Sequence, residues 1–232
     1  MNNLIVLPLL IPLVCGLVTA IFRKKILFQK IFSMLGVILT GITSFYLVSQ
    51  VSSQGIQTLQ FGGWPAPYGI TFALDMFAAL LLLTASLVSF ACLLFAFSSI
   101  GQEREKYYFY PLYQFLMVGV NGSFLTGDLF NLFVCFEVML LASYVLLSLG
   151  GTKPQLRESI KYIIINTISS SLFLIAIAYL YRITGTVNMA HLSLLIKQAG
   201  QDGLITTVAM LFLVVFSLKA GLLLFFWLPG FI

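Results

Sequence analysis

Two charged residues of this chain lie within long apolar runs. Glu137 lies near the centre of the run 132–141, and Lys219 lies in the run 214–221. A charged side chain at the centre of a bilayer costs about 2.5–3.5 kcal/mol on insertion scales, and such residues are functional by default. Burial favours the neutral form of both groups and their mutual attraction favours the charged forms, so a small movement can transfer a proton. We therefore expect Glu137 and Lys219 to form a proton-handling pair. The alternative is a static ion pair that only holds two helices together.

A second group of polar residues surrounds this expected pair. Asn166 and Ser170 lie in another apolar run and are candidates for a hydrated path, although small polar residues of this kind also make contacts between helices. Lys161 lies at the entry of the same run, where it either extends its ammonium group to the membrane surface or feeds protons inward. Asp75 and Asp128 lie at the edges of apolar runs, and we expect each to cap a helix N-terminus.

The composition indicates the class of protein that holds these residues. The chain has 232 residues, of which 60% are hydrophobic and 8% are charged, whereas soluble domains carry roughly 25% charged residues. Its net charge of +5 comes from basic residues in short links, without the basic patch and interleaved aromatics of a nucleic-acid binder. The sequence contains no cluster with metal-ligand spacing, no phosphate loop and no dinucleotide fingerprint. We therefore expect a membrane protein without a metal or cofactor.

The apolar runs predict an all-α, polytopic membrane protein with about seven transmembrane helices. Each run is close to the ~20 residues that span a bilayer core. The predicted helices cover roughly 3–22, 28–48, 72–98, 108–126, 128–148, 160–181 and 204–228. Nine Lys and Arg residues follow helices one, three and five, and the opposite loops hold only two. This asymmetry predicts an N-terminus outside the cell.

Three connections add detail to this arrangement. Residues 49–71 are uncharged and end in a stretch rich in turn formers and aromatics, and we expect them to have their own structure outside the membrane. Residues 184–203 are apolar on one side, which predicts a short helix on the membrane surface. Only residues 126–128 join the fourth and fifth helices, so these two must be antiparallel neighbours.

Several motifs in order resemble a known family. The run 124–143, the segment 185–192 and the step Lys219-Ala220 resemble the antiporter-like subunits of respiratory complex I and of Mrp-type sodium/proton antiporters, and the segment 7–12 resembles the Mrp D subunit most closely. The resemblance implies that Glu137 and Lys219 are elements of a proton pathway. It also implies a hetero-oligomeric complex in the cytoplasmic membrane that moves H+ and Na+. Members of the family are built around two inverted repeats with broken helices, so helices 1–3 (1–107) would precede a partial repeat (108–232).

The chain departs from the family pattern near its end. The family usually has a proline after the lysine of the seventh helix, whereas this chain has Gly221 there and no proline before Pro229. The second repeat is absent, and we expect the chain to be a truncated N-terminal half of an antiporter subunit. The alternatives are a proton-pumping membrane subunit of an NADH:quinone oxidoreductase or membrane hydrogenase, and an inactive fragment.

Overall fold

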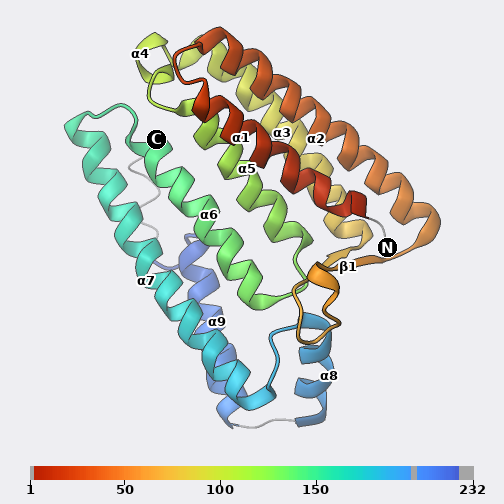
Figure 1. Ribbon diagram of the computed structural model, residues 1–232. Helices are drawn as coiled ribbons and strands as arrows, with labels where there is room; N and C mark the ends of the chain where they lie inside the picture. The colour runs from red at the N-terminus through yellow and green to blue at the C-terminus, as the bar shows by residue number, and fades with distance from the viewer. Residues whose placement is uncertain (1–2, 200–202, 225–232) are drawn as a thin grey trace. The chain divides into compact units, whose positions relative to one another are not determined.

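The computed structural model of the chain describes residues 3–199 and 203–224, which are mostly helical (Figure 1). A short 3-10 helix, η1 (Asn3–Val6), leads into the first α-helix. The remaining elements are, in chain order, α1 (Leu7–Ile21), α2 (Ile26–Gln54), β1 (Gln57–Gln60), η2 (Phe61–Gly63), β2 (Thr71–Leu74), α3 (Met76–Ser99), α4 (Gln102–Glu105), α5 (Phe109–Leu125), α6 (Leu129–Ser148), α7 (Lys153–Thr184), α8 (Met189–Ala199) and α9 (Gly203–Lys219).

Seven of these helices coincide with the seven predicted spans, which confirms an all-α, polytopic membrane fold. Five segments are long and apolar enough to cross a membrane: Asn3–Ile21, Ile26–Gln54, Met76–Ser99, Leu129–Ser148 and Lys153–Thr184. The helices α5 and α9 have 17 residues each. At 1.5 Å per residue they are about 25 Å long, slightly less than a ~30 Å bilayer core. The outward orientation of the N-terminus stays a prediction.

The third helix begins later than the sequence predicted. Residues 72–75 were expected to be helical, but Thr71–Leu74 form β2, which pairs with β1. Asp75 then caps α3, because its Oδ1 accepts a hydrogen bond of 2.7 Å from the backbone N–H of Ala78. The carboxylate thereby satisfies one of the free N–H groups of the first turn. The predicted cap is confirmed, and it fixes the helix start.

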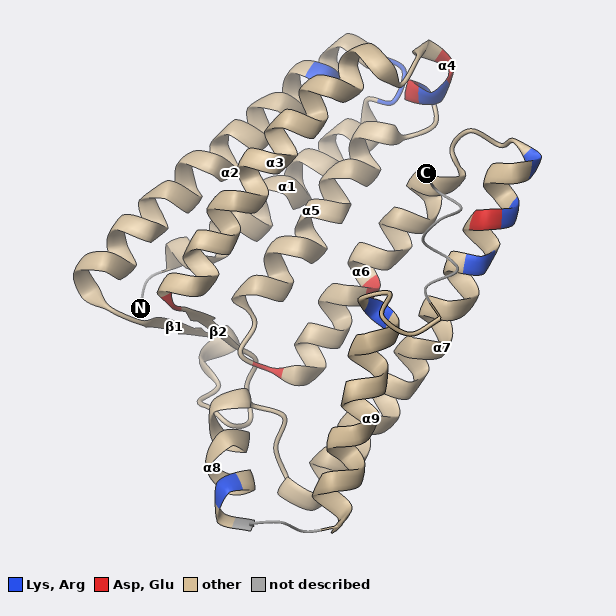
Figure 2. Cartoon of the chain, turned by 180° about the vertical axis from the view of Figure 1, so that it is seen from behind, with Lys and Arg blue, Asp and Glu red and all other residues tan. Residues whose placement is uncertain are grey.

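Two other helices are longer than predicted. Helix α2 continues beyond residue 48 to Gln54, where Gly55 ends it with a φ of 77°. Helix α7 begins at Lys153 instead of residue 160, and Pro154 occupies its first turn. Proline suits that position because its missing N–H has no partner there in any helix. Several charged residues lie in α4 and at the start of α7, and others are spread along the chain (Figure 2).

The chain forms two compact units. The first comprises Met1–Leu59, Phe72–Thr126 and Cys135–Leu149, and the second comprises Gln60–Thr71, Gly127–Val134 and Gly150–Ile232. This division describes packing and does not test the predicted boundary at residue 107. In the first unit α1, α2, α3 and α5 lie side by side (Figure 1). In the second unit α7 packs along α9, and α8 contacts them through Leu192, which packs with Leu180 and Val208. The amphipathic helix expected within 184–203 is therefore present as α8.

Candidate functional site

Glu137 lies in the middle of α6 and is partly buried. Its Oε1 atom is shielded from solvent and accepts no hydrogen bond within residues 3–199 and 203–224. A buried carboxylate oxygen without a donor is costly, and a proton or a cationic partner removes that cost. Glu137 thus holds a shielded carboxyl oxygen that has no donor among the described residues, and its role in proton transfer stays a prediction.

Gly119 of α5 brings its helix against the part of α6 that carries Glu137. A Cβ atom at Gly119 would lie 2.6 Å from the backbone N of Met139 and 2.7 Å from the carbonyl oxygen of Cys135. A Cβ atom at Gly122 would lie 2.7 Å from Cys135 Sγ. These contacts confirm that the two helices are antiparallel neighbours. The short connection 126–128 predicted that the two helices are neighbours, but the close contact at Gly119 was not identified from the sequence.

Lys219 lies in the second unit and contacts α7. Its Nζ donates a hydrogen bond of 3.1 Å to Ser170 Oγ. One residue away, Ser169 Oγ donates to the carbonyl oxygen of Val215 at 3.2 Å. Both serines are buried. The structure thus brings two of the predicted site residues together, with the ammonium group of Lys219 held against a buried hydroxyl.

The helix that carries Lys219 ends at that residue. The sequence predicted one continuous helix over 204–228, of which 225–228 lie outside the described residues. Gly221 has a φ of 69°, its N–H donates to Leu218 O, and the N–H of Leu222 donates to Ser217 O. This pair of bonds is the glycine-dependent Schellman motif, which ends helices. The prediction was wrong for residues 220–224, because glycine ends the helix here without a proline.

The backbone at this helix end is polarised. The last carbonyl groups of a helix carry a partial negative charge equivalent to about half an elementary charge. Lys219 is the final helical residue, so its backbone lies within the last turn, where this field is strongest. Its ammonium group is placed by the hydrogen bond to Ser170 Oγ of α7.

The other two predicted residues lie along α7. Asn166 is buried one turn before Ser170, and its Nδ2 donates to Tyr162 O at 2.9 Å. Lys161 forms an ion pair with Glu158, with 2.7 Å between Nζ and Oε1. One polar stretch of the second unit therefore contains Asn166, Ser170 and Lys219. The ion pair of Lys161 with Glu158 lies closer to the start of α7. Glu137 belongs to the first unit, so its pairing with Lys219 stays a prediction.

An aromatic cluster lies one helical turn from Lys219 and Ser170 along α9 and α7. Phe173, three residues after Ser170, is fully buried, and its ring centroid lies 5.5 Å from that of Phe216 and 5.8 Å from that of Phe212. Phe133 completes the cluster at 6.0 Å from Phe173. Contacts of this kind are typical of stable aromatic packing. The cluster forms an apolar layer one turn from the Lys219–Ser170 hydrogen bond.

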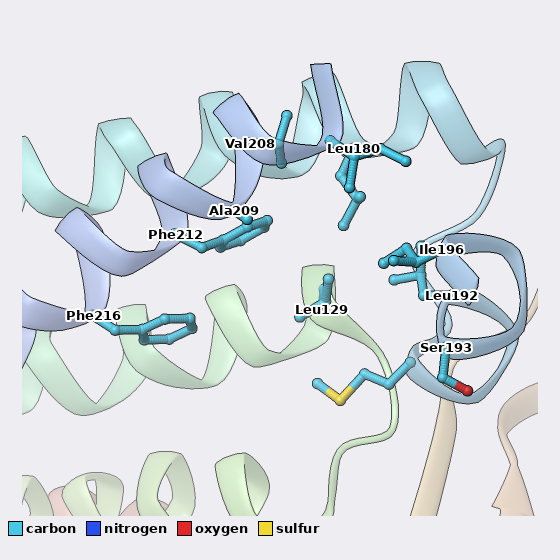
Figure 3. Close-up of a pocket in the computed structure, with 11 residues that line it drawn as sticks. Leu129, Leu180, Leu192, Ser193, Ile196, Val208, Ala209, Phe212 and Phe216 are labelled. Atoms are coloured by element: carbon cyan, nitrogen blue, oxygen red, sulfur yellow. The ribbon is translucent and has the colours of Figure 1, made fainter. Parts of the chain in front are cut away.

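An apolar pocket of about 370 Å³ lies beyond this layer (Figure 3). Figure 3 shows the rings of Phe212 and Phe216 on the α9 side and Ile196 and Leu192 on the α8 side. Among the eleven lining residues, Ser193 alone carries a polar side chain. The lining consists of Leu129, Leu180, Met189, Leu192, Ser193, Ile196, Ile205, Val208, Ala209, Phe212 and Phe216. A pocket this apolar does not hold ions, so the polar stretch near Lys219 ends at the aromatic layer.

Asp128 caps α6, as predicted, and its carboxyl group lies at the edge of the second unit. Its Oδ1 accepts a hydrogen bond of 2.8 Å from the backbone N–H of Asn131, and its backbone pairs with Asn188. Burial raises the pKa of Asp128 above its ordinary value, although its backbone hydrogen bonds act in the opposite direction. Within the described ranges no group of three or more His, Cys, Asp or Glu residues could hold a metal ion.

Comparisons with known proteins agree with this arrangement. Residues 126–231 match the family described as NADH:quinone oxidoreductase/Mrp antiporter, TM. Over 230 residues the chain is 52% identical to the D subunit of the Na(+)/H(+) antiporter of Alkalihalophilus pseudofirmus, a match that covers 99% of this chain and 47% of that protein. The chain therefore spans about half the length of this curated relative.

Two solved structures share the fold. A chain of the archaeal membrane-bound sulfane sulfur reductase, a respiratory membrane complex, superposes with a TM-score of 0.86 at 29% identity, over 99% of this chain and 47% of that one. A chain of the Mrp complex from Dietzia sp. DQ12-45-1b superposes with a TM-score of 0.82 at 32% identity, over 95% of this chain and 42% of that one.

Proposed function

We propose, from the relationship of this chain to the D subunits of Na(+)/H(+) antiporters, that it is a membrane subunit of a multisubunit sodium/proton antiporter. It would act in the cell membrane, together with other subunits of the complex, and exchange Na+ for H+. In this role it is a transporter subunit and not an enzyme. Glu137 and Lys219 would carry the proton, and Ser170 and Asn166 would line the path to Lys219.

The observation that carries this proposal is the position of Lys219. Lys219 is the last residue of the apolar helix α9, and its ammonium group donates to Ser170 Oγ. Ends of broken helices are common ion sites in membrane transporters, because their carbonyl groups face a cavity instead of continuing a hydrogen-bonded helix. An apolar layer at Phe173 then limits how far water can follow the path in that direction.

The side chains suggest how a proton would move. The Ser170 hydroxyl accepts from Lys219 and retains its own hydrogen to donate onward. Asn166 lies one turn away on the same face of α7 and offers further hydrogen-bonding groups. A proton that leaves Lys219 would be carried by water hydrogen-bonded to Ser170 and Asn166, and the Glu137 carboxyl group would receive or supply it.

Everted membrane vesicles that contain the chain with the other subunits test this function. Addition of Na+ should collapse a preformed pH gradient, and Glu137→Gln or Lys219→Ala should abolish the response. Matched controls are Glu103→Gln and Lys106→Ala, which remove the partners of an exposed surface ion pair and should leave activity unchanged. Full activity in either mutant of Glu137 or Lys219 would refute the assigned roles.

A second candidate function is a proton-pumping membrane subunit of an oxidoreductase. The close superposition on a chain of the sulfane sulfur reductase favours it, as does a matching family that includes NADH:quinone oxidoreductases. Purification from the native membrane distinguishes the two functions. Association with flavin or iron–sulfur subunits, together with proton pumping driven by a reductant and independent of Na+, would favour the oxidoreductase.

A further inference from the structure

Three buried side chains of the first unit have acceptor oxygens without donors. Gln29 and Ser33 lie one turn apart on α2, and Gln114 lies on α5, all at most 2% exposed. Within the described part of the chain, Gln29 Oε1, Ser33 Oγ and Gln114 Oε1 have no hydrogen-bond partner. Inside a bilayer an unsatisfied polar group costs several kcal/mol, so three neighbouring ones indicate a missing donor.

Hydrogen bonds and close contacts place these groups together. Gln114 Nε2 donates to Ser33 O at 3.0 Å, which joins α5 to α2. Gly36 lies one turn after Ser33, and a Cβ atom there would lie 3.5 Å from Gln114 Nε2 and close to Cys15 Sγ. The cluster therefore occupies the junction of α1, α2 and α5, and Cys15 borders it.

Exchanging the amide atoms does not supply the missing donors. Gln29 Nε2 faces the carbonyl oxygens of Arg23 and Phe22 at 2.8 and 3.4 Å. Gln114 Nε2 likewise faces a carbonyl oxygen. If either amide were reversed, two acceptors would face each other and the NH2 group would lose its partner. The orphaned oxygens therefore require a donor from outside these side chains.

The cluster continues into a charged network at one end of the helices. Lys30, next to Gln29, pairs with Glu105 at 2.6 Å between Nζ and Oε1. Tyr110, one turn before Gln114, donates its hydroxyl to the same carboxylate oxygen at 2.8 Å. Lys30 retains 27% side-chain exposure whereas Glu105 retains 4%. This network follows the buried oxygens along α2 and α5, toward the helix ends that the distribution of basic residues predicts to be cytoplasmic.

We propose that the junction of α1, α2 and α5 binds internal water molecules, held by Gln29, Ser33 and Gln114 and continuous with the Lys30–Glu105–Tyr110 network. Water supplies two donors per molecule and typically makes about three hydrogen bonds in buried sites. A few molecules thus satisfy the orphaned oxygens and form a hydrated inlet into the first unit. The inference does not depend on the proposed antiport function, because it rests on the hydrogen-bonding requirements of these side chains.

Hydroxyl-radical footprinting by X-ray radiolysis of the chain in its native membrane tests this site. The radicals form from water in place, so buried side chains beside bound water are oxidised. Cys15, which is 6% exposed, should be oxidised readily. Ser33→Ala and Gln114→Leu should each reduce its oxidation rate severalfold.

Ser44→Ala is the matched control. Ser44 lies on the same helix and is equally buried, but its Oγ already donates to Thr40 O at 2.8 Å. This substitution should leave Cys15 oxidation unchanged. The proposal is wrong if Cys15 of the wild-type protein resists oxidation, or if Ser33→Ala and Ser44→Ala give the same rate. If Gln114→Leu fails to accumulate in the membrane, the Ser33 and Ser44 comparison alone decides.

Discussion

Replacement of Gly119 by alanine would separate α5 from the part of α6 that carries Glu137. The added Cβ atom would lie 2.6 Å from Met139 N and 2.7 Å from Cys135 O, whereas ordinary contact begins at 3.4 Å. Both neighbours are backbone atoms and cannot rotate away, so the helices must move apart by about 0.8 Å. Overpacking of this kind typically costs about 1–3 kcal/mol. Misplacement of a reacting group by about 1 Å can reduce a rate about 100-fold.

The control for this substitution is Gly41→Ala in α2. A Cβ atom there would lie 3.5 Å from Ser86 Oγ, which is an ordinary contact. Because alanine favours a helix by up to about 1 kcal/mol over glycine, Gly41→Ala should be neutral or stabilising. Unfolding of the detergent-solubilised protein measures the stability of each variant, and Na+-dependent collapse of the pH gradient measures activity. If Gly119→Ala matches Gly41→Ala in both assays, the tight contact between α5 and α6 does not position Glu137.

Three further predictions concern the second unit. Ser170→Ala should lower Na+-dependent proton release in vesicles, because Lys219 loses a hydrogen-bond acceptor worth about 1.5–3 kcal/mol. Ser170→Thr should restore proton release, because it keeps the hydroxyl. Equal rates for the two variants would contradict a role of the Ser170 hydroxyl. Gly221→Ala should destabilise the detergent-solubilised protein by about 1–2 kcal/mol, because the backbone φ of Gly221 is 69°. In the control Gly203→Ala, the added Cβ atom meets no atom within 4 Å, so this substitution should cost little. Similar unfolding curves for the two variants would refute the helix-end argument. Asp128 has a raised pKa in the folded protein, so its contribution to stability should be full below pH 3.8 and lost as the pH rises through the folded-state pKa. Asp128→Asn should keep the helix cap but remove this pH dependence of unfolding.

The amino-acid sequence was sufficient for most of the transmembrane architecture. Apolar runs of about 20 residues identify membrane helices because the bilayer requires that length and tolerates no unpaired backbone. The caps at Asp75 and Asp128 followed from the same physics, because a carboxylate before an apolar run is well placed to bind free N–H groups. Glu137 and Lys219 were visible for a similar reason, since their runs contain no other Asp, Glu, Lys, Arg or His residue.

Tertiary contacts were beyond the reach of the same reasoning. Ser33 and Gln114 are 81 residues apart in the sequence, and no periodicity indicates that they meet at one junction with Gln29. Gly119 and Cys135 likewise come together only because α5 and α6 pack as antiparallel neighbours in one register. In each case the sequence does not show which faces of the two helices meet. Lipid contact makes much of the outer surface apolar as well, so apolar character does not identify the inner face.

The end of α9 shows how a local signal can be misread when it is compared with only one alternative. The expected break after Lys219 was a proline, and its absence suggested a continuous helix. Glycine breaks a helix by a different route, because it adopts a positive φ at little cost and lets two backbone N–H groups bond back to the last turn. Gly221 does this two residues after Lys219, with N–H groups of residues 221 and 222 bonded to Leu218 and Ser217. Proline and glycine can both end a helix at this position, so the absence of the expected proline does not imply a continuous helix.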